Sequence, residues 1–138
     1  MFSKANIIST LVLTIWAFGG GYLLWGILGE SLFADHMLTE GLMKEMPDMA
    51  YIFVGCLIQA FGFSTIYGKY GATAYGAASG FALGFWFSVI VGLGEGLIDF
   101  ATANILDLQG ILINFVLFVI FFGIMGLLAG LIYKKTTA

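Results

Sequence analysis

One carboxylate of the sequence stands in an unusual place for a charged group. Glu95 lies between two glycines in the segment GLGEGLIDF, directly after an apolar stretch over 81–93. A carboxylate inside a membrane can bind an ion or relay a proton, whereas one at the membrane boundary can reach water. It can also hydrogen-bond a neighbouring helix. The depth of the helix that carries Glu95 therefore decides which chemistry is open to it.

Four other residues are candidates to form a polar cluster with Glu95. Asp99 follows it by about one helical turn, and Asn114 lies early in the last apolar segment. Tyr22 and Tyr51 lie near the end of the first apolar segment and the start of the second. If consecutive segments cross a membrane in alternating directions, all five positions lie near the same surface. We expect them to form a candidate polar or ion site there.

A second polar candidate lies in the middle of an apolar segment. Gln59 is close to the centre of the second segment, and Thr14 and Ser88 are expected at comparable depth. An amide in hydrocarbon needs partners, and interhelical hydrogen bonds of this kind contribute about 0.6–2 kcal/mol. Gln59 therefore predicts either a buried interhelical hydrogen bond or part of a path for an ion or substrate.

The sequence lacks the signatures of other chemistries. The single cysteine and the single histidine, Cys56 and His36, are far apart and cannot assemble a zinc site. Asp35 and Ser31 near His36 do not match the arrangement of a catalytic triad. No GxxxxGK[ST], CxxC or HExxH motif is present. We expect no enzymatic activity, no metal site and no cofactor.

Composition identifies the kind of chain that must position these residues. The sequence is 61% hydrophobic and only 9% charged, with a mean hydropathy of +1.05. Soluble domains carry about 25% charged residues, so this chain could not cover a soluble surface. It is also acidic, with a net charge of −3, and lacks the basic patch that nucleic-acid binding requires. The composition predicts an integral membrane protein that does not bind nucleic acid.

Four apolar segments are long enough to cross a membrane. A spanning helix needs about 20 residues, and helix is expected because backbone polar groups in lipid must be satisfied within the segment. The sequence therefore predicts an all-α fold, an antiparallel bundle of four transmembrane helices in a single domain over 1–138. The expected helices cover about 7–29, 49–68, 72–98 and 110–133, with an outer connection over 30–48.

The distribution of charge predicts the orientation of these helices. Four of the five lysines lie at the two termini and in the second connection, whereas all eight acidic residues lie in the first and third connections or beside them. Positive charge favours the cytoplasmic side. We therefore expect both termini in the cytoplasm, in a multi-pass protein of the cell membrane, the inner membrane of a bacterium. Aromatic belts are expected at the inner side, from Tyr67, Tyr70, Tyr75 and Tyr133, and at the outer side, from Tyr22, Trp25 and Tyr51.

The same geometry predicts the depth of Glu95. The third segment is centred near Phe85, ten residues before Glu95, which corresponds to about 15 Å along a helix. Half of the hydrocarbon core is also about 15 Å. Glu95 is therefore expected at the outer boundary, where an interfacial carboxylate in contact with water is favoured over an ion or proton site at the mouth of a cavity.

Small residues recur every four positions in the third segment. A stripe of this kind lets helix backbones approach closely, and a shorter repeat occurs in the fourth segment. Each four-residue step turns about 40° past a full circle, so the stripe is expected to wind around the helix and meet several neighbours, either other helices or a second subunit. A thin-walled pore, or a groove for lipid or pigment, is the alternative. The predicted helix-packing residues are Ala72, Gly76, Gly80, Gly84, Ser88, Gly92 and Gly96, with Gly126 and Gly130.

Two stretches of the sequence resemble a known family. GYLLWGILGESLF at the end of the first segment and LINFVLFVIFFGIMGLLAG in the fourth resemble small four-helix bacterial membrane proteins classed as a domain of unknown function. The resemblance implies the four-helix architecture. It implies no activity and transfers no residue roles.

These observations predict a non-enzymatic membrane protein that acts through helix packing, as a homo-oligomer or as an accessory subunit of a larger membrane complex. Its partners would be the lipid bilayer and either further copies of itself or other membrane subunits, bound through the third segment. The alternative is a small channel or transporter for an ion or small solute, with Glu95 near the outer mouth and Gln59 near the midplane.

Overall fold

The computed structural model describes residues 2–70 and 74–137, and helices dominate it. Four of these helices are long and apolar enough to cross a membrane. Within the described residues the only β-structure is an isolated bridge between Met37 and Leu106. The prediction of an all-helical chain with four helices that could cross a membrane is therefore confirmed. The candidate spans are Lys4–Phe33, Met49–Lys69, Ala77–Thr102 and Leu108–Thr137.

Two of the spans contain a π-helical segment. The first span consists of α1 (Lys4–Gly21), η1 (Tyr22–Leu28) and α2 (Gly29–Phe33). The third consists of α4 (Ala77–Ser88), η2 (Val89–Gly94) and α5 (Glu95–Thr102). The second and fourth are the single helices α3 (Met49–Tyr70) and α6 (Leu108–Thr137).

Polar side chains define where three of the helices begin. The Ser3 hydroxyl accepts a hydrogen bond from the Asn6 amide at 3.1 Å and caps α1. Asp107 caps α6 in the same way, because its Oδ1 accepts from the Gly110 amide at 2.7 Å. At the start of α3, the Asp48 carbonyl accepts a hydrogen bond from the Ile52 amide at 3.1 Å, and its carboxylate accepts one from the Tyr51 amide at 3.4 Å. Such side chains satisfy donors that the first helical turn leaves unpaired.

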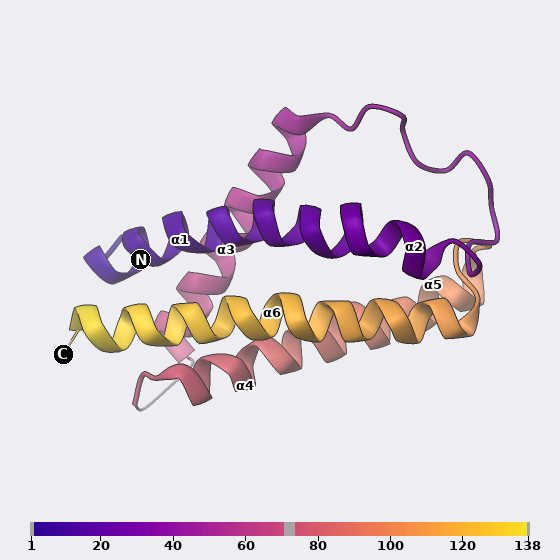
Figure 1. The fold of residues 1–138 in the computed structure, drawn as a ribbon. Coiled ribbons are helices and arrows are strands. Elements are labelled where there is room, and N and C mark those ends of the chain that lie inside the picture. Colours follow the sequence, from indigo (N-terminus) through magenta and orange to yellow (C-terminus); the bar gives the residue numbers. More distant parts are fainter. Residues whose placement is uncertain (1, 71–73, 138) are drawn as a thin grey trace.

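Helix α6 is the central element of the fold. Its most extensive neighbour is α4, and α1 packs on another side of it (Figure 1). Helix α3 packs mainly on α1 and crosses the other spans obliquely, so that its N-terminal half stands away from them (Figure 1). Both chain termini lie at the same end of the molecule (Figure 1). Buried aromatic rings, including Phe63, Phe121 and Phe122, fill the space beside α6.

The small residues of the third span face α6 at backbone contact distance. A Cβ atom at Gly80 or Gly84 would overlap the carbonyl oxygen of Gly126 or Phe122, and one at Gly130 would overlap that of Gly76. Further along, Gly92 faces Phe118 and Gly96 faces Ile111, and the Ser88 hydroxyl donates to the Phe118 carbonyl at 2.8 Å. Ala72 lies outside the described residues. The stripe therefore allows two backbones to touch, which no larger residue would permit.

From Gly76 to Gly96 the stripe meets α6, not several neighbours as its spacing predicts for a uniform α-helix. The physical reason is the π-helical segment η2, Val89–Gly94. A π-turn is closed by i→i+5 hydrogen bonds and so holds more residues than an α-turn. A four-residue step therefore turns less than a full circle in η2 and more than one in α4. The two drifts oppose each other, which returns Gly92 and Gly96 to the face that packs on α6.

We predict that Gly80→Ala destabilises the fold by about 1–3 kcal/mol, as overpacking of a filled interior does. Gly19→Ala is the matched control, because a Cβ there meets nothing within 4 Å. Alanine in place of a helical glycine otherwise stabilises by about 0.5–1 kcal/mol. Thermal unfolding of the two variants in detergent, followed by circular dichroism, tests this. Equal transition temperatures for both variants would contradict the α4–α6 contact.

Candidate functional site

The structure does not bring the five residues of the predicted outer cluster together. Asn114 is half-buried, and its Oδ1 accepts a hydrogen bond from Trp25 Nε1 at 2.7 Å. Tyr22 is 62% exposed and packs over Gly26 in its own helix. Trp25 belongs to η1, whose π-turns rotate its side chain relative to a continuous α-helix. The Trp25 indole, and not the Tyr22 ring, therefore lies beside Asn114.

The remaining members of that cluster are exposed. Tyr51 is 79% exposed because it lies in the first turn of α3, which stands away from the other spans. Glu95 and Asp99 are exposed at the start and in the middle of α5. Among residues 2–70 and 74–137, no side-chain hydrogen bond or ion pair joins either carboxylate to another residue. Neither carboxylate therefore belongs to a polar cluster within these residues.

Gln59 is also exposed, in contrast to the other polar residues expected near the midplane. It is the middle residue of the Met49–Lys69 span, and no hydrogen bond reaches its amide within the part of the chain that the structure describes. Thr14 donates instead to a backbone carbonyl of its own helix at 2.7 Å, and the Ser88 hydroxyl lies 2.9 and 2.8 Å from the carbonyls of Gly84 and Phe118. Their hydroxyls are satisfied inside the chain, whereas the Gln59 amide faces outward.

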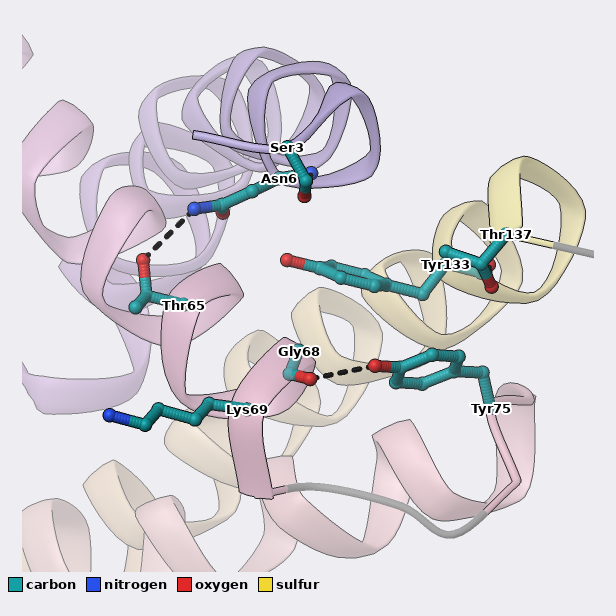
Figure 2. Close-up of a pocket in the computed structure, with 8 residues that line it drawn as sticks. All are labelled: Ser3, Asn6, Thr65, Gly68, Lys69, Tyr75, Tyr133 and Thr137. Atoms are coloured by element: carbon teal, nitrogen blue, oxygen red, sulfur yellow. Dashed lines mark hydrogen bonds between the residues drawn. The ribbon is translucent and has the colours of Figure 1, made fainter. Parts of the chain in front are cut away.

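A polar pocket lies at the other end of the molecule, beside the two termini. It encloses about 570 Å³ and is formed where the ends of α1, α3 and α6 meet the residues that precede α4 (Figure 2). We call it the inner pocket, because the lysines predict that this end faces the cytoplasm. Its lining residues are Ser3, Asn6, Thr65, Gly68, Lys69, Tyr75, Tyr133 and Thr137.

Asn6 organises the wall between α1 and α3. Its side chain is only 3% exposed, and its Nδ2 donates to Thr65 Oγ1 at 3.1 Å (Figure 2). Its Oδ1 accepts from the hydroxyls of Ser64 and Thr10. A buried amide is tolerated when its donors and acceptors are paired in this way. Asn6 therefore holds the first turns of α1 against the last turns of α3.

Tyr75 and Tyr133 form the opposite wall, and the fully buried Tyr67 packs against both rings. Tyr67, Tyr75 and Tyr133 have ring centroids 5.1–5.4 Å apart. The Tyr133 hydroxyl is buried and donates to the Ser64 carbonyl at 2.9 Å, and that of Tyr75 donates to the Gly68 carbonyl at 2.6 Å. These bonds tie α6 and the start of the third span to the end of α3.

The sequence contains signals for the inner pocket. Tyr67, Tyr75 and Tyr133 were expected in the inner aromatic belt, where the structure gathers them at one end of the bundle; the side chain of Tyr70 lies outside the described part. Asn6 was not among the predicted site residues. Its helical spacing from Thr10, and the Ser64–Thr65 pair on another span, were the available signs of a polar contact.

The pocket contains groups that can bind a ligand. Among the described residues that line it, the polar side-chain atoms come from hydroxyls, one amide and one ammonium group. Among residues 2–70 and 74–137, no group of three or more His, Cys, Asp or Glu side chains could hold a metal ion. The pocket can therefore offer hydrogen bonds and a positive charge to a ligand.

A second polar contact joins the first and third connections, at the end that the charge distribution predicts to be outer. His36 Nδ1 lies 3.0 Å from Asp107 Oδ2, and the Asp107 amide donates to the His36 carbonyl at 2.9 Å. The Leu38 amide donates to the Ile105 carbonyl at the same distance. The imidazole and the Gly110 amide hold the pKa of the Asp107 carboxyl below its usual range. We call this contact between the first and third connections the outer clasp.

The fold and its polar contacts define the class of protein. Four long apolar helices, two of them with π-turns, make this chain a multi-pass helical membrane protein. Comparisons with protein-family models, with curated proteins and with solved structures found no match.

We predict that the outer clasp weakens in acid. The pKa of Asp107 is lowered in the folded state, so the carboxylate contributes stability above its unfolded pKa, and this contribution is lost as the pH falls through the folded value, below about 4. Hydrogen-exchange protection of the Leu38 and Asp107 amides, measured at pH 6 and at pH 3, should drop at the lower pH.

Two variants separate this effect from general acid sensitivity. Asp107→Asn should lose protection at both pH values and show little change between them. Asp99→Asn, which alters an exposed carboxylate of α5, should behave like the unaltered chain. Protection that is the same at both pH values in the unaltered chain would contradict the role of Asp107.

Proposed function

We propose that this protein is a non-enzymatic integral membrane protein that acts by associating with other chains, as a homo-oligomer or as an accessory subunit of a larger membrane complex. Its spans would alternate in direction as an antiparallel four-helix bundle, with both termini in the cytoplasm. The lysines at the termini and the acidic residues of the opposite connections support this orientation.

The surface that supports association belongs to the second span. The small-residue stripe of the third span is occupied by α6, so it offers no free contact face to another chain. In α3, by contrast, residues 49–59 are exposed apart from the half-buried Cys56, and only the second half of the helix contributes to the core. An edge contact between Phe53 and Phe18 is the main ring contact of the exposed half.

One observation carries the proposal: Gln59 is exposed in the middle of a membrane span. Its amide offers two donors and a carbonyl acceptor, and hydrocarbon can satisfy none of them. A polar group that is left unpaired in an apolar medium raises the free energy by about 1–3 kcal/mol. A helix of another chain that supplies a hydrogen-bond partner removes this cost. In a symmetric dimer, the partner would be the Gln59 of the second copy, since an amide can both donate and accept.

The alternative of a channel or transporter has less support. It requires Glu95 and Gln59 to line a shared path, but both are exposed on different spans and neither lines the inner pocket. Association through α3 uses the exposed amide directly.

We predict that Gln59→Leu weakens association in a bilayer by about 3- to 30-fold, the equivalent of about 0.6–2 kcal/mol for an interhelical hydrogen bond. Gln59→Asn keeps an amide and should retain most of the affinity. Energy transfer between donor- and acceptor-labelled chains, measured in vesicles over a range of protein-to-lipid ratios, gives the association constants.

Ile15→Ala is the control, because Ile15 is similarly exposed but lies on α1. It should leave the association constant unchanged. An equal loss in the Ile15 and Gln59 variants, or no loss in Gln59→Leu, would contradict the assignment of the surface to α3.

A further inference from the structure

The inner pocket has the size and position of a site for a small amphiphile. Its volume of about 570 Å³ falls within the range of about 300–1,000 Å³ found for small-molecule sites. It lies between the ends of membrane spans, at the end of the molecule where the two termini lie (Figures 1 and 2). A ligand there can place a polar group among the lining side chains and apolar chains along the exposed Ile7 and Ile66 of α1 and α3.

Two hydroxyls in this pocket are arranged to donate hydrogen bonds. Ser3 Oγ accepts a hydrogen bond from the backbone amide of Asn6, and Thr65 Oγ1 accepts one from the side-chain Nδ2 of Asn6. A hydroxyl has one hydrogen to donate in addition to its acceptor sites. Within the described part of the chain, neither hydroxyl hydrogen has an acceptor. Asn6 therefore holds the Ser3 and Thr65 hydroxyl oxygens in place. Their hydrogens can be donated to a ligand that has several hydrogen-bond acceptors.

The electrostatic environment of the pocket favours an anion. Lys69 lies on its rim, with its stem along the end of α3 and its ammonium turned away from Tyr133 (Figure 2). The pocket also includes the first residues of α1, where the helix dipole places a partial positive charge. Lys134 and Lys135 lie in the last turn of α6 nearby, whereas all acidic residues occur within 30–48 and 95–107.

We propose that the inner pocket binds the phosphate headgroup of an anionic phospholipid from the cytoplasmic leaflet. The phosphate oxygens would accept hydrogen bonds from Ser3 and Thr65, and the exposed Lys69 side chain would rotate toward the pocket to pair with them. Charge-assisted bonds of this kind are among the strong ones. Basic pockets between membrane helices on the cytoplasmic side suit such headgroups. The tyrosine wall would face the glycerol and the first methylene groups. The choice of leaflet rests on the proposed orientation. The site itself is separate from the association surface at residues 49–59 of α3, so lipid binding and association can each fail without the other.

Lipid selectivity provides the test. The full-length protein is placed in phosphatidylcholine vesicles that contain a trace of spin-labelled phosphatidylglycerol or, as the reference, spin-labelled phosphatidylcholine. Electron paramagnetic resonance then gives the relative association constant of each lipid. Salt at about 0.5 M reduces the Debye length to about 4–5 Å, so diffuse attraction to surface lysines is suppressed. The proposal predicts a preference for phosphatidylglycerol that persists at this salt concentration.

Charge variants show whether the preference comes from the pocket. Lys69→Gln should lower it about fivefold, the effect of one lysine near an anionic surface. Lys135→Gln removes the same charge at the same end but outside the pocket lining, and should change it by less than about twofold. Thr65→Val keeps the shape of the side chain and removes its hydroxyl, so it should also lower the preference. The thermal transition of each variant confirms that it is folded.

Three results would overturn the proposal. The first is no preference for phosphatidylglycerol over phosphatidylcholine. The second is an equal loss in Lys69→Gln and Lys135→Gln, which indicates diffuse attraction only. The third is displacement of the labelled phosphatidylglycerol by millimolar inorganic phosphate, which indicates a site for the free ion instead of a lipid.

Discussion

The arrangement of the molecule depends on the direct contact between the backbones of α4 and α6. Glycines at 76, 80 and 84 meet glycines at 126 and 130 with no side chain between them. Without a hydrophobic driving force between helices in lipid, association relies on such close packing and on hydrogen bonds. The contact makes α6 the central helix, and the indole groups of Trp16 and Trp25 then hydrogen-bond to it from the first span.

The π-helical segment η2 lets this contact continue along the third span. Without it, a four-residue repeat would turn away from α6 after a few steps. With it, Ser88, Gly92 and Gly96 remain against Phe118 and Ile111. The consequence for function is that the third span has no free small-residue surface. Association with another chain must then use a surface other than this stripe, and α3 is the candidate span least covered by the rest of the molecule.

Composition and spacing were sufficient to predict the class of fold, because a chain with so little charge and four long apolar segments can only be satisfied in a bilayer. The close-packing glycines also followed from their four-residue spacing. Which helix the whole stripe would face could not be predicted, because a pattern of residue types does not reveal where α-turns become π-turns. The same limit applies to Tyr22 and Trp25, because the directions of their side chains depend on the π-turns of η1. The inner pocket depends on which helix ends meet, so Asn6 and Thr65 could not be paired from spacing alone.

The two ends and the middle of the molecule have different roles. The inner end is tied together by Asn6 and three tyrosines, the outer end by His36 and Asp107, and the exposed half of α3 is left for contact with other chains. The most direct test of this account is native mass spectrometry of the protein, released from its own membrane under mild conditions. If the chain associates with other chains, the spectrum should contain species heavier than one chain. Their mass should be an integer multiple of 14.9 kDa or that of a complex with other subunits. A single species of 14.9 kDa, with no heavier protein assembly, would contradict this association.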